Sequence, residues 1–106
     1  MIKQAPLTES YFYILLCLYK ENLHGYAIMQ KTKELSMGNV SIGAGTMYGA
    51  TGNMIKKGWI EEVFGQEWDE RGKRLYKLTN QGKEVLLCEV ERLKSLMANA
   101  QSILEN

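Results

Sequence analysis

The sequence has 106 residues, of which 45% are hydrophobic and 24% charged, and its net charge at pH 7 is +1. This length allows one domain with its own core and excludes two independent modules. The longest apolar run near the start, 11–19, is shorter than the roughly 20 residues that span a bilayer, and no cleavage signature follows it, so we expect a cytoplasmic protein.

Two short helices are predicted first. Apolar residues recur at spacings of three and four over 7–18, with Thr8 as a candidate N-cap, and again over 26–35. The segment 22–25 interrupts the pattern and predicts a turn, and Gly38 suits the end of the second helix. His24 is the single histidine, and we expect it to be a capping or packing residue.

A third helix is predicted over 45–57. Its interior holds Gly49 and Gly52, each of which costs about 1 kcal/mol relative to alanine in an exposed helix. Two explanations remain open from the sequence. The helix backbone approaches another molecule closely at these glycines, or the glycines allow tight packing on neighbouring helices.

Two strands are predicted next, at 59–64 and 74–78, and the second alternates polar and apolar residues as a half-buried strand requires. The polar loop between them, of about nine residues, is longer than a tight hairpin and predicts a projecting wing. Basic residues are dense over 71–77 and follow acidic ones at 67–70. This pattern fits a solvated hairpin as well as a contact with nucleic acid.

A long C-terminal helix is predicted after Thr79, its candidate N-cap. Apolar residues recur along it at alternating spacings of four and three, the pattern of a dimerisation seam, at Leu86, Val90, Leu93, Met97, Ala100 and Leu104. Together with its apolar neighbours this seam is wider than one small domain can cover, which predicts a homodimer. Cys17 and Cys88 each lie in an apolar helical pattern and are expected to be buried thiols.

The fold class that follows is mainly α with a small two-stranded antiparallel wing. A winged helix-turn-helix domain is expected over 1–78 and a dimerisation helix over 79–106.

Four segments of the sequence closely resemble the PadR family of transcriptional regulators. They are LHGYAIM at 23–29, GTMYGA at 45–50, KGWI at 57–60 and RLYKLTNQG at 74–82, and the likeness spans roughly residues 8–85. The single C-terminal helix resembles the short-tailed branch of the family. One common form of the family has proline at Gly49 and a basic residue at Asn53, so this sequence departs from that form at both positions.

The resemblance implies a dimeric repressor whose third helix enters the DNA major groove, while the wing reaches the adjacent minor groove or the backbone. It also implies that Tyr26 contacts a phosphate, against the alternative that this ring packs in the core. Some members of the family respond to small aromatic or lipophilic compounds. The operator would be pseudo-palindromic, because a two-fold dimer reads two half-sites.

The residues predicted to bind double-stranded DNA lie near the third helix, at Tyr26 and in the wing. They are Tyr26, Ser41, Thr46, Tyr48, Asn53, Lys73 and Arg74. Hydroxyls near a helix N-terminus suit phosphates, and an asparagine amide pairs bidentately with adenine. For Asn53 a solvent-facing role without base contact is an equal alternative.

The sequence lacks a nucleophile with its base, a phosphate-binding loop and metal-ligand spacing, so we predict no enzyme activity, metal or cofactor. The alternative function is a winged helix that binds only proteins, since the fold alone does not specify DNA. Tyr11, Leu15, Leu93 and Met97 are the candidate residues for a small hydrophobic or aromatic effector in a cavity at the dimer interface, and a fully packed dimer core is the favoured alternative.

Overall fold

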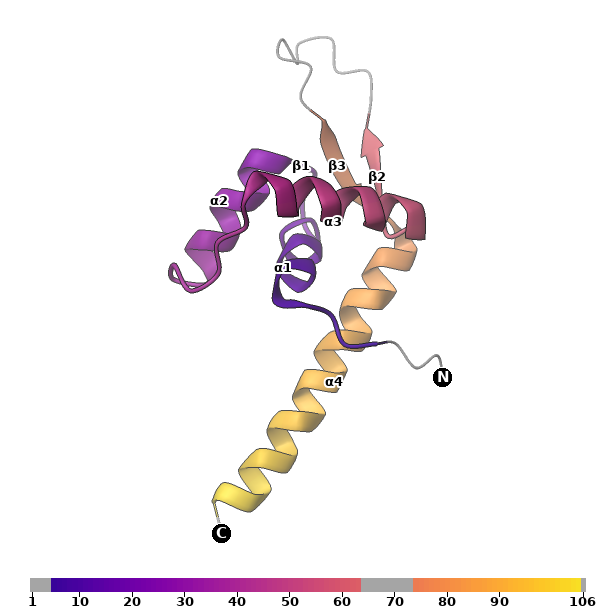
Figure 1. Cartoon of the computed structure of the whole chain (residues 1–106). Helices are drawn as coiled ribbons and strands as arrows, with labels where there is room; N and C mark the ends of the chain where they lie inside the picture. Colours follow the sequence, from indigo (N-terminus) through magenta and orange to yellow (C-terminus); the bar gives the residue numbers. More distant parts are fainter. Residues whose placement is uncertain (1–4, 64–73, 106) are drawn as a thin grey trace.

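The computed structural model describes residues 5–63 and 74–105, and within these ranges it confirms the mainly helical winged architecture. Three helices pack with a small sheet, and a long helix leaves the domain at its base (Figure 1). In chain order the elements are α1 (Glu9–Cys17), β1 (Leu23–His24), α2 (Gly25–Leu35), α3 (Ala44–Lys57), β2 (Ile60–Val63), β3 (Leu75–Leu78) and α4 (Asn80–Leu104).

Both predicted threonine N-caps are confirmed. Thr8 Oγ1 accepts the backbone N–H of Tyr11 at 3.2 Å, and Thr79 Oγ1 accepts that of Gly82 at 3.0 Å. Each cap satisfies one of the N–H groups that a helix start leaves unpaired. At its C-terminus α3 ends on Gly58, whose φ of +78° favours glycine. These residues therefore fix where α1, α3 and α4 begin or end.

The sheet has three antiparallel strands in the order β1-β3-β2, so the two-stranded wing predicted from the sequence was incomplete. The additional strand, β1, pairs Leu23 with Tyr76 and His24 with Leu75. His24 Nδ1 also donates to the carbonyl oxygen of Arg74 at 3.0 Å, which ties this strand to the start of β3. A strand of two residues is too short to show a period-two pattern, and the sequence predicted only a turn there.

The core lies where α1, α2 and α3 meet the sheet and the first turns of α4. Ile14, Leu15 and Ile28 are fully buried. Met54 of α3 is fully buried as well, and Ile60 of β2 is only 1% exposed. Burying these side chains is the main favourable contribution to folding, at about 25 cal/mol per Å² of apolar surface. The core therefore fixes α3 relative to the rest of the domain.

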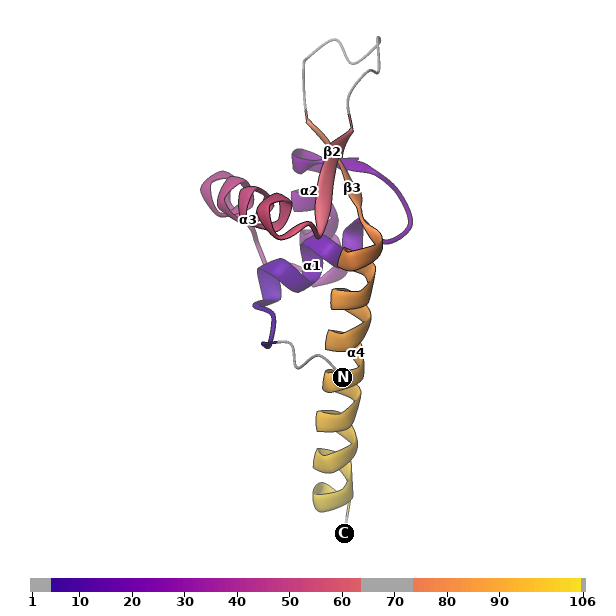
Figure 2. The same cartoon turned by 90° about the vertical axis from the view of Figure 1, so that its right-hand side faces the viewer.

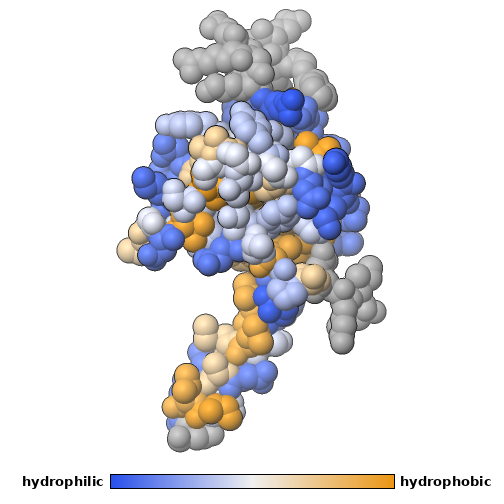
Figure 3. All heavy atoms as spheres, viewed as in Figure 1, coloured by the Kyte–Doolittle hydropathy of each residue, from blue (hydrophilic) through white to orange (hydrophobic). Residues whose placement is uncertain are grey.

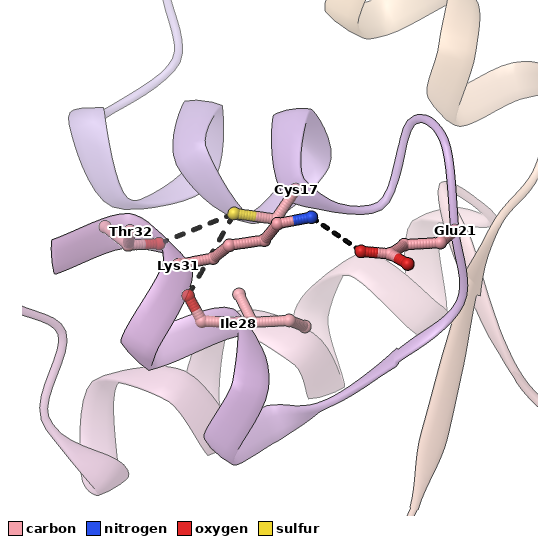
Figure 4. A network of polar contacts seen from close by, with 5 residues as sticks. All are labelled: Cys17, Glu21, Ile28, Lys31 and Thr32. Atoms are coloured by element: carbon pink, nitrogen blue, oxygen red, sulfur yellow. Dashed lines mark hydrogen bonds and ion pairs between the residues drawn. The ribbon is translucent and has the colours of Figure 1, made fainter. Parts of the chain in front are cut away.

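One of the two cysteines was predicted correctly. Cys17 is buried, with Sγ 3.8 Å from Thr32 Oγ1 and 4.0 Å from the Ile28 carbonyl oxygen (Figure 4), and burial raises its pKa. Beside it on the surface, Lys31 Nζ pairs with Glu21 at 2.6 Å. The prediction that Cys88 is buried was wrong, because Val85, Leu86 and Glu89 occupy the inward face of α4 and leave Cys88 exposed.

The helix α4 is 25 residues long, about 37 Å at 1.5 Å per residue, and only its first turns pack on the domain. Its remainder projects away from the three-helix core (Figures 1 and 2). At the point of departure the buried Glu89 carboxylate accepts two hydrogen bonds from Arg92 at 2.8 Å and the Leu7 backbone N–H at 3.2 Å. These bonds attach the chain segment before α1 to α4.

Candidate nucleic-acid interface

The outward side of α3 is almost free of side chains. Met47, Ala50, Thr51 and Met54 occupy its buried side. The opposite side presents Gly45, Gly49, Gly52 and Lys56, spaced by four, three and four residues; we call these four residues the glycine face. A Cβ built on any of the three glycines meets nothing within 4 Å. Packing on neighbouring helices is therefore the wrong explanation for Gly49 and Gly52.

Hydroxyl groups flank the glycine face near the start of α3. Ser41 and Thr46 are exposed, and the Tyr48 side chain is 66% exposed. Gly43 occupies the N-cap and supplies no side-chain acceptor to the first turn of the helix. Backbone N–H groups and hydroxyls at such a helix start are suited to bind phosphate oxygens.

Tyr26 lies at the start of α2 and is 62% exposed, so the alternative that it packs in the core is wrong. Its hydroxyl oxygen accepts a hydrogen bond from Gln30 Nε2 at 2.7 Å, one helical turn further along. This bond orients the phenol at the surface.

Arg74 marks the edge of the wing, immediately before β3. Its side chain is 63% exposed and lies 3.3 Å from Glu62 on the neighbouring strand β2. An exposed pair of this kind contributes little to stability, so the guanidinium remains available for another anion. Lys73, the other predicted wing contact, lies outside the described residues.

Asn53 does not belong to the glycine face but lies on the flank of α3 that faces α1. Its Nδ2 donates to the Tyr11 hydroxyl at 2.9 Å. Neither of the two roles considered from the sequence included this partner, because the two residues are 42 positions apart and come from different helices.

An open hollow of about 790 Å³ lies beside this hydrogen bond. Its walls come from the segment before α1, from α1, from the end of α3 and from the first turns of α4. We call it the hollow; its lining residues are Ala5, Pro6, Leu7, Thr8, Tyr11, Asn53, Lys57, Trp59, Gln81, Glu84, Val85 and Cys88.

Aromatic rings form one side of the hollow. The rings of Tyr11 and Trp59 meet edge to face with centroids 6.5 Å apart, and Lys57 Nζ lies 5.1 Å from the Trp59 ring centroid. No sequence signal predicted that Lys57 would contact Trp59, because such contacts depend on where the helix meets the strand.

The predicted effector residues are not brought together within one chain. Tyr11 lines the hollow, but Leu15 is fully buried in the core, and neither Leu93 nor Met97 lines the hollow. A regular apolar pattern does not reveal which positions a domain covers with its own core and which it leaves open.

The predicted dimerisation seam divides into two parts. Leu86 is only 2% exposed and belongs to the core of its own chain, and Val90 is half-buried. Leu93, Met97 and Leu104 are 39%, 59% and 82% exposed, and Ala100 is exposed as well. Hydrophobic residues gather on this projecting half of α4 (Figure 3). Among the seam residues, only those on this half are exposed to another molecule.

Within residues 5–63 and 74–105 there is no group of three or more His, Cys, Asp or Glu side chains placed to hold a metal ion. None of the helices in these ranges is long and apolar enough to cross a membrane.

Comparison with known proteins places this geometry in a family. Solved structures with the same fold include a PadR family transcription regulator from Clostridium difficile, with a TM-score of 0.74 and 26% identity over 92% of this chain and 99% of that one. The protein smu.1704 from Streptococcus mutans has a TM-score of 0.75 and 24% identity, over 98% of this chain and 95% of that one. A transcriptional regulator from Clostridium thermocellum has a TM-score of 0.75 and 20% identity, over 89% of this chain and 91% of that one.

The comparison with curated proteins gave no significant match. The family model for the transcriptional regulator PadR-like family matches residues 14–87, more than two thirds of the sequence. The chain therefore belongs to the PadR-like family of transcriptional regulators.

Proposed function

We propose that this protein represses transcription by binding, as a homodimer, to a pseudo-palindromic DNA operator. The observation that carries the proposal is the glycine face of α3. Three glycines stand on the open side of one helix, and within residues 5–63 and 74–105 no neighbour requires them. Gly49 and Gly52, in the interior of the helix, each cost about 1 kcal/mol of helix stability relative to alanine, which is a large cost for a domain of this size. A partner outside the chain accounts for that cost.

The DNA major groove is such a partner. It is about 12 Å wide, close to the 10–12 Å diameter of a helix with its side chains, so a helix with a bare face lies deeper in it. Lys56 at the end of the glycine face then lies near the phosphates, as do the hydroxyls of Thr46 and Tyr48 at its flank. Sequence is read by the flanking side chains and by the shape of the groove.

Two further groups extend this surface. Tyr26 offers an exposed phenol at the start of α2, and Arg74 offers an exposed guanidinium at the edge of the wing. Ser41 lies just before α3. The chain carries a net charge of only +1, so the positive potential that DNA binding needs must come from the local placement of such groups.

A second copy of the chain is the proposed cover for α4. Leu93 and Ala100 follow the buried Leu86 at steps of seven residues, so they lie on the continuation of the face that the first turns bury. An exposed apolar stripe of this length is unusual on a monomer. Two-fold pairing of the stripes would present two α3 helices to half-sites about 34 Å apart, or a multiple of this distance.

The hollow is the proposed site of a small hydrophobic or aromatic effector that releases the protein from DNA. Tyr11 and Trp59 offer ring surfaces, and Lys57 offers a cation for an acidic substituent. Residues of both α3 and α4 line the hollow, so an occupant touches the DNA-facing helix and the dimer helix at once. Such an occupant changes DNA affinity only if it binds the two arrangements of these helices unequally.

The test begins by footprinting the protein on the DNA upstream of its own coding region and then titrating that site and random DNA over a range of salt. Gly49→Leu adds a side chain to the glycine face at a position where a Cβ meets nothing within 4 Å, and we expect it to weaken both complexes by at least tenfold. Ser95→Leu adds the same side chain to an exposed position of α4 and should leave DNA binding unchanged.

Two results contradict the proposal. Wild-type protein that binds no DNA at low salt would favour the alternative of a winged helix that binds only proteins. A Gly49→Leu variant with wild-type DNA affinity would show that the glycine face does not meet DNA.

A further inference from the structure

The hydrogen bond between Asn53 and Tyr11 connects the flank of the proposed DNA interface to the hollow. Asn53 Nδ2 donates to the Tyr11 hydroxyl oxygen at 2.9 Å. The Tyr11 ring is itself held by edge-to-face contact with Trp59, whose side chain is 8% exposed. The Tyr11 side chain is therefore held in place by packing, whereas Asn53 lies on the exposed surface of α3.

The chemistry of an amide shows what this bond leaves available. Asparagine has two N–H groups and one carbonyl oxygen, and bidentate recognition of adenine uses one N–H and the oxygen. The Tyr11 hydroxyl takes up one N–H and leaves the other N–H and Oδ1 unchanged. The bond also determines which end of the amide faces α1, and so it fixes the orientation in which the remaining two groups meet DNA.

We propose that Tyr11 is a positioning residue for the DNA interface, which orients the Asn53 amide for contact with a base edge without touching DNA itself. This inference rests on the proposed function. Holding a side chain in its bound orientation before binding reduces the entropy that binding costs, and the gain is limited to complexes in which Asn53 meets its matching base. Tyr11 thus contributes to sequence discrimination rather than to general affinity.

The same bond gives an occupant of the hollow a route to the DNA interface. Tyr11 and Asn53 both line the hollow, so a molecule that hydrogen-bonds to the Tyr11 hydroxyl competes with the Asn53 amide for it. Loss of that bond would reduce affinity for the operator and leave affinity for random DNA unchanged. The Tyr11 hydroxyl is therefore the group through which a molecule bound in the hollow changes sequence discrimination by Asn53.

The experiment compares four proteins on the footprinted operator and on random DNA: wild type, Tyr11→Phe, Asn53→Ala and the double variant. Tyr11→Phe keeps the ring contact with Trp59 and removes only the hydroxyl. We expect it to weaken operator binding roughly three- to tenfold, the range for one net hydrogen bond, with unchanged random binding and salt slope. In the Asn53→Ala background the same change should have no effect.

Tyr13→Phe is the matched control, since it removes a hydroxyl from another half-buried tyrosine of α1 and should leave operator binding unchanged. The positioning role is overturned if Tyr11→Phe binds the operator as wild type does. It is also overturned if the effect persists in the Asn53→Ala background, which would assign it to the packing of α1. Wild-type protein that binds neither the operator nor random DNA contradicts the proposed function instead. Failure of the positioning role and failure of the proposed function are therefore distinguishable.

Discussion

Gly82 of α4 lies directly against the backbone of Trp59, which precedes β2. A Cβ on Gly82 would overlap the Trp59 carbonyl oxygen and come within 2.7 Å of Leu78 Cδ1. The same carbonyl oxygen accepts the Thr79 backbone N–H at 3.0 Å, so the contact is fixed from the other side as well. The first turn of α4 can pack on the domain only because position 82 has no side chain.

We therefore expect Gly82→Ala to lower the free energy of unfolding by about 1–3 kcal/mol, the usual cost of forcing a methyl group into a packed site. Urea or thermal unfolding at one protein concentration measures this. Equal stability of the variant and wild type would mean that α4 shifts freely on the domain.

Gly52→Ala should behave in the opposite way. The new methyl group meets no atom within 4 Å, and alanine favours the helix, so the free energy of unfolding should rise by about 1 kcal/mol. For a domain of this size the melting temperature then rises by roughly 4–8 °C. DNA affinity should fall at the same time, and a variant that gains both stability and affinity would contradict the role of the glycine face.

Glu89→Gln should destabilise the protein at pH 7 by about 1–3 kcal/mol, because it weakens charge-assisted hydrogen bonds at a buried position. The two Arg92 hydrogen bonds, with a further one from the Leu7 N–H, lower the pKa of Glu89 below its ordinary value of 4.5, although burial opposes this. A lowered pKa means that this stabilisation is complete above the unfolded-state pKa and is lost as pH falls through the folded-state pKa.

The stability difference between wild type and Glu89→Gln should therefore narrow once the pH falls below about 4.5. Denaturant titrations between pH 7 and pH 3 measure the difference. A gap that stays constant over this range would show that the carboxylate is not the stabilising species.

Leu93→Glu should convert the proposed dimer to a monomer at micromolar concentration, because it places a charge in the exposed apolar stripe of α4. Sedimentation equilibrium measures the mass, and Ser95→Glu, at an exposed position off the stripe, is the control that should remain dimeric. Wild-type protein that sediments as a monomer would contradict the proposed dimer. Truncation before Leu86 is no test, since it removes part of the core.

The two thiols should react at very different rates. Cys88 is exposed and should be modified at once by a thiol reagent in the native protein, whereas Cys17 is buried and has a raised pKa, so it should react only on unfolding. Because Cys88 lines the hollow, a bound effector should slow its modification. Reaction of two thiols at one rate in native protein would contradict this placement.

Sequence periodicity predicted the helices well because their apolar residues repeat over three or more turns. The caps at Thr8 and Thr79 followed from chemistry local to the helix start. Strand β1 was missed because its two residues join the sheet only through pairing with β3, more than 50 positions away. Such pairing leaves no trace in a short segment.

The site was harder to predict than the fold. A heptad pattern treats Leu86 and Leu93 alike, but the domain covers one and leaves the other exposed. Cys88 lies in an apolar stretch and yet faces outward, since the inward face of α4 is narrower than its apolar composition suggests. The bond between Asn53 and Tyr11 depends on how α3 crosses α1, which only the assembled core determines.

The contact between Gly82 and the Trp59 backbone sets the angle at which α4 leaves the domain. The helix extends for about 33 Å from this point to Leu104 without interruption, so a tilt of about 5° at the base would displace its far end by roughly 3 Å. In a two-fold dimer held by the far halves of these helices, both domains would swing by that amount relative to each other. The close packing at this one glycine would then determine how well the separation of the two α3 helices matches the DNA repeat of about 34 Å.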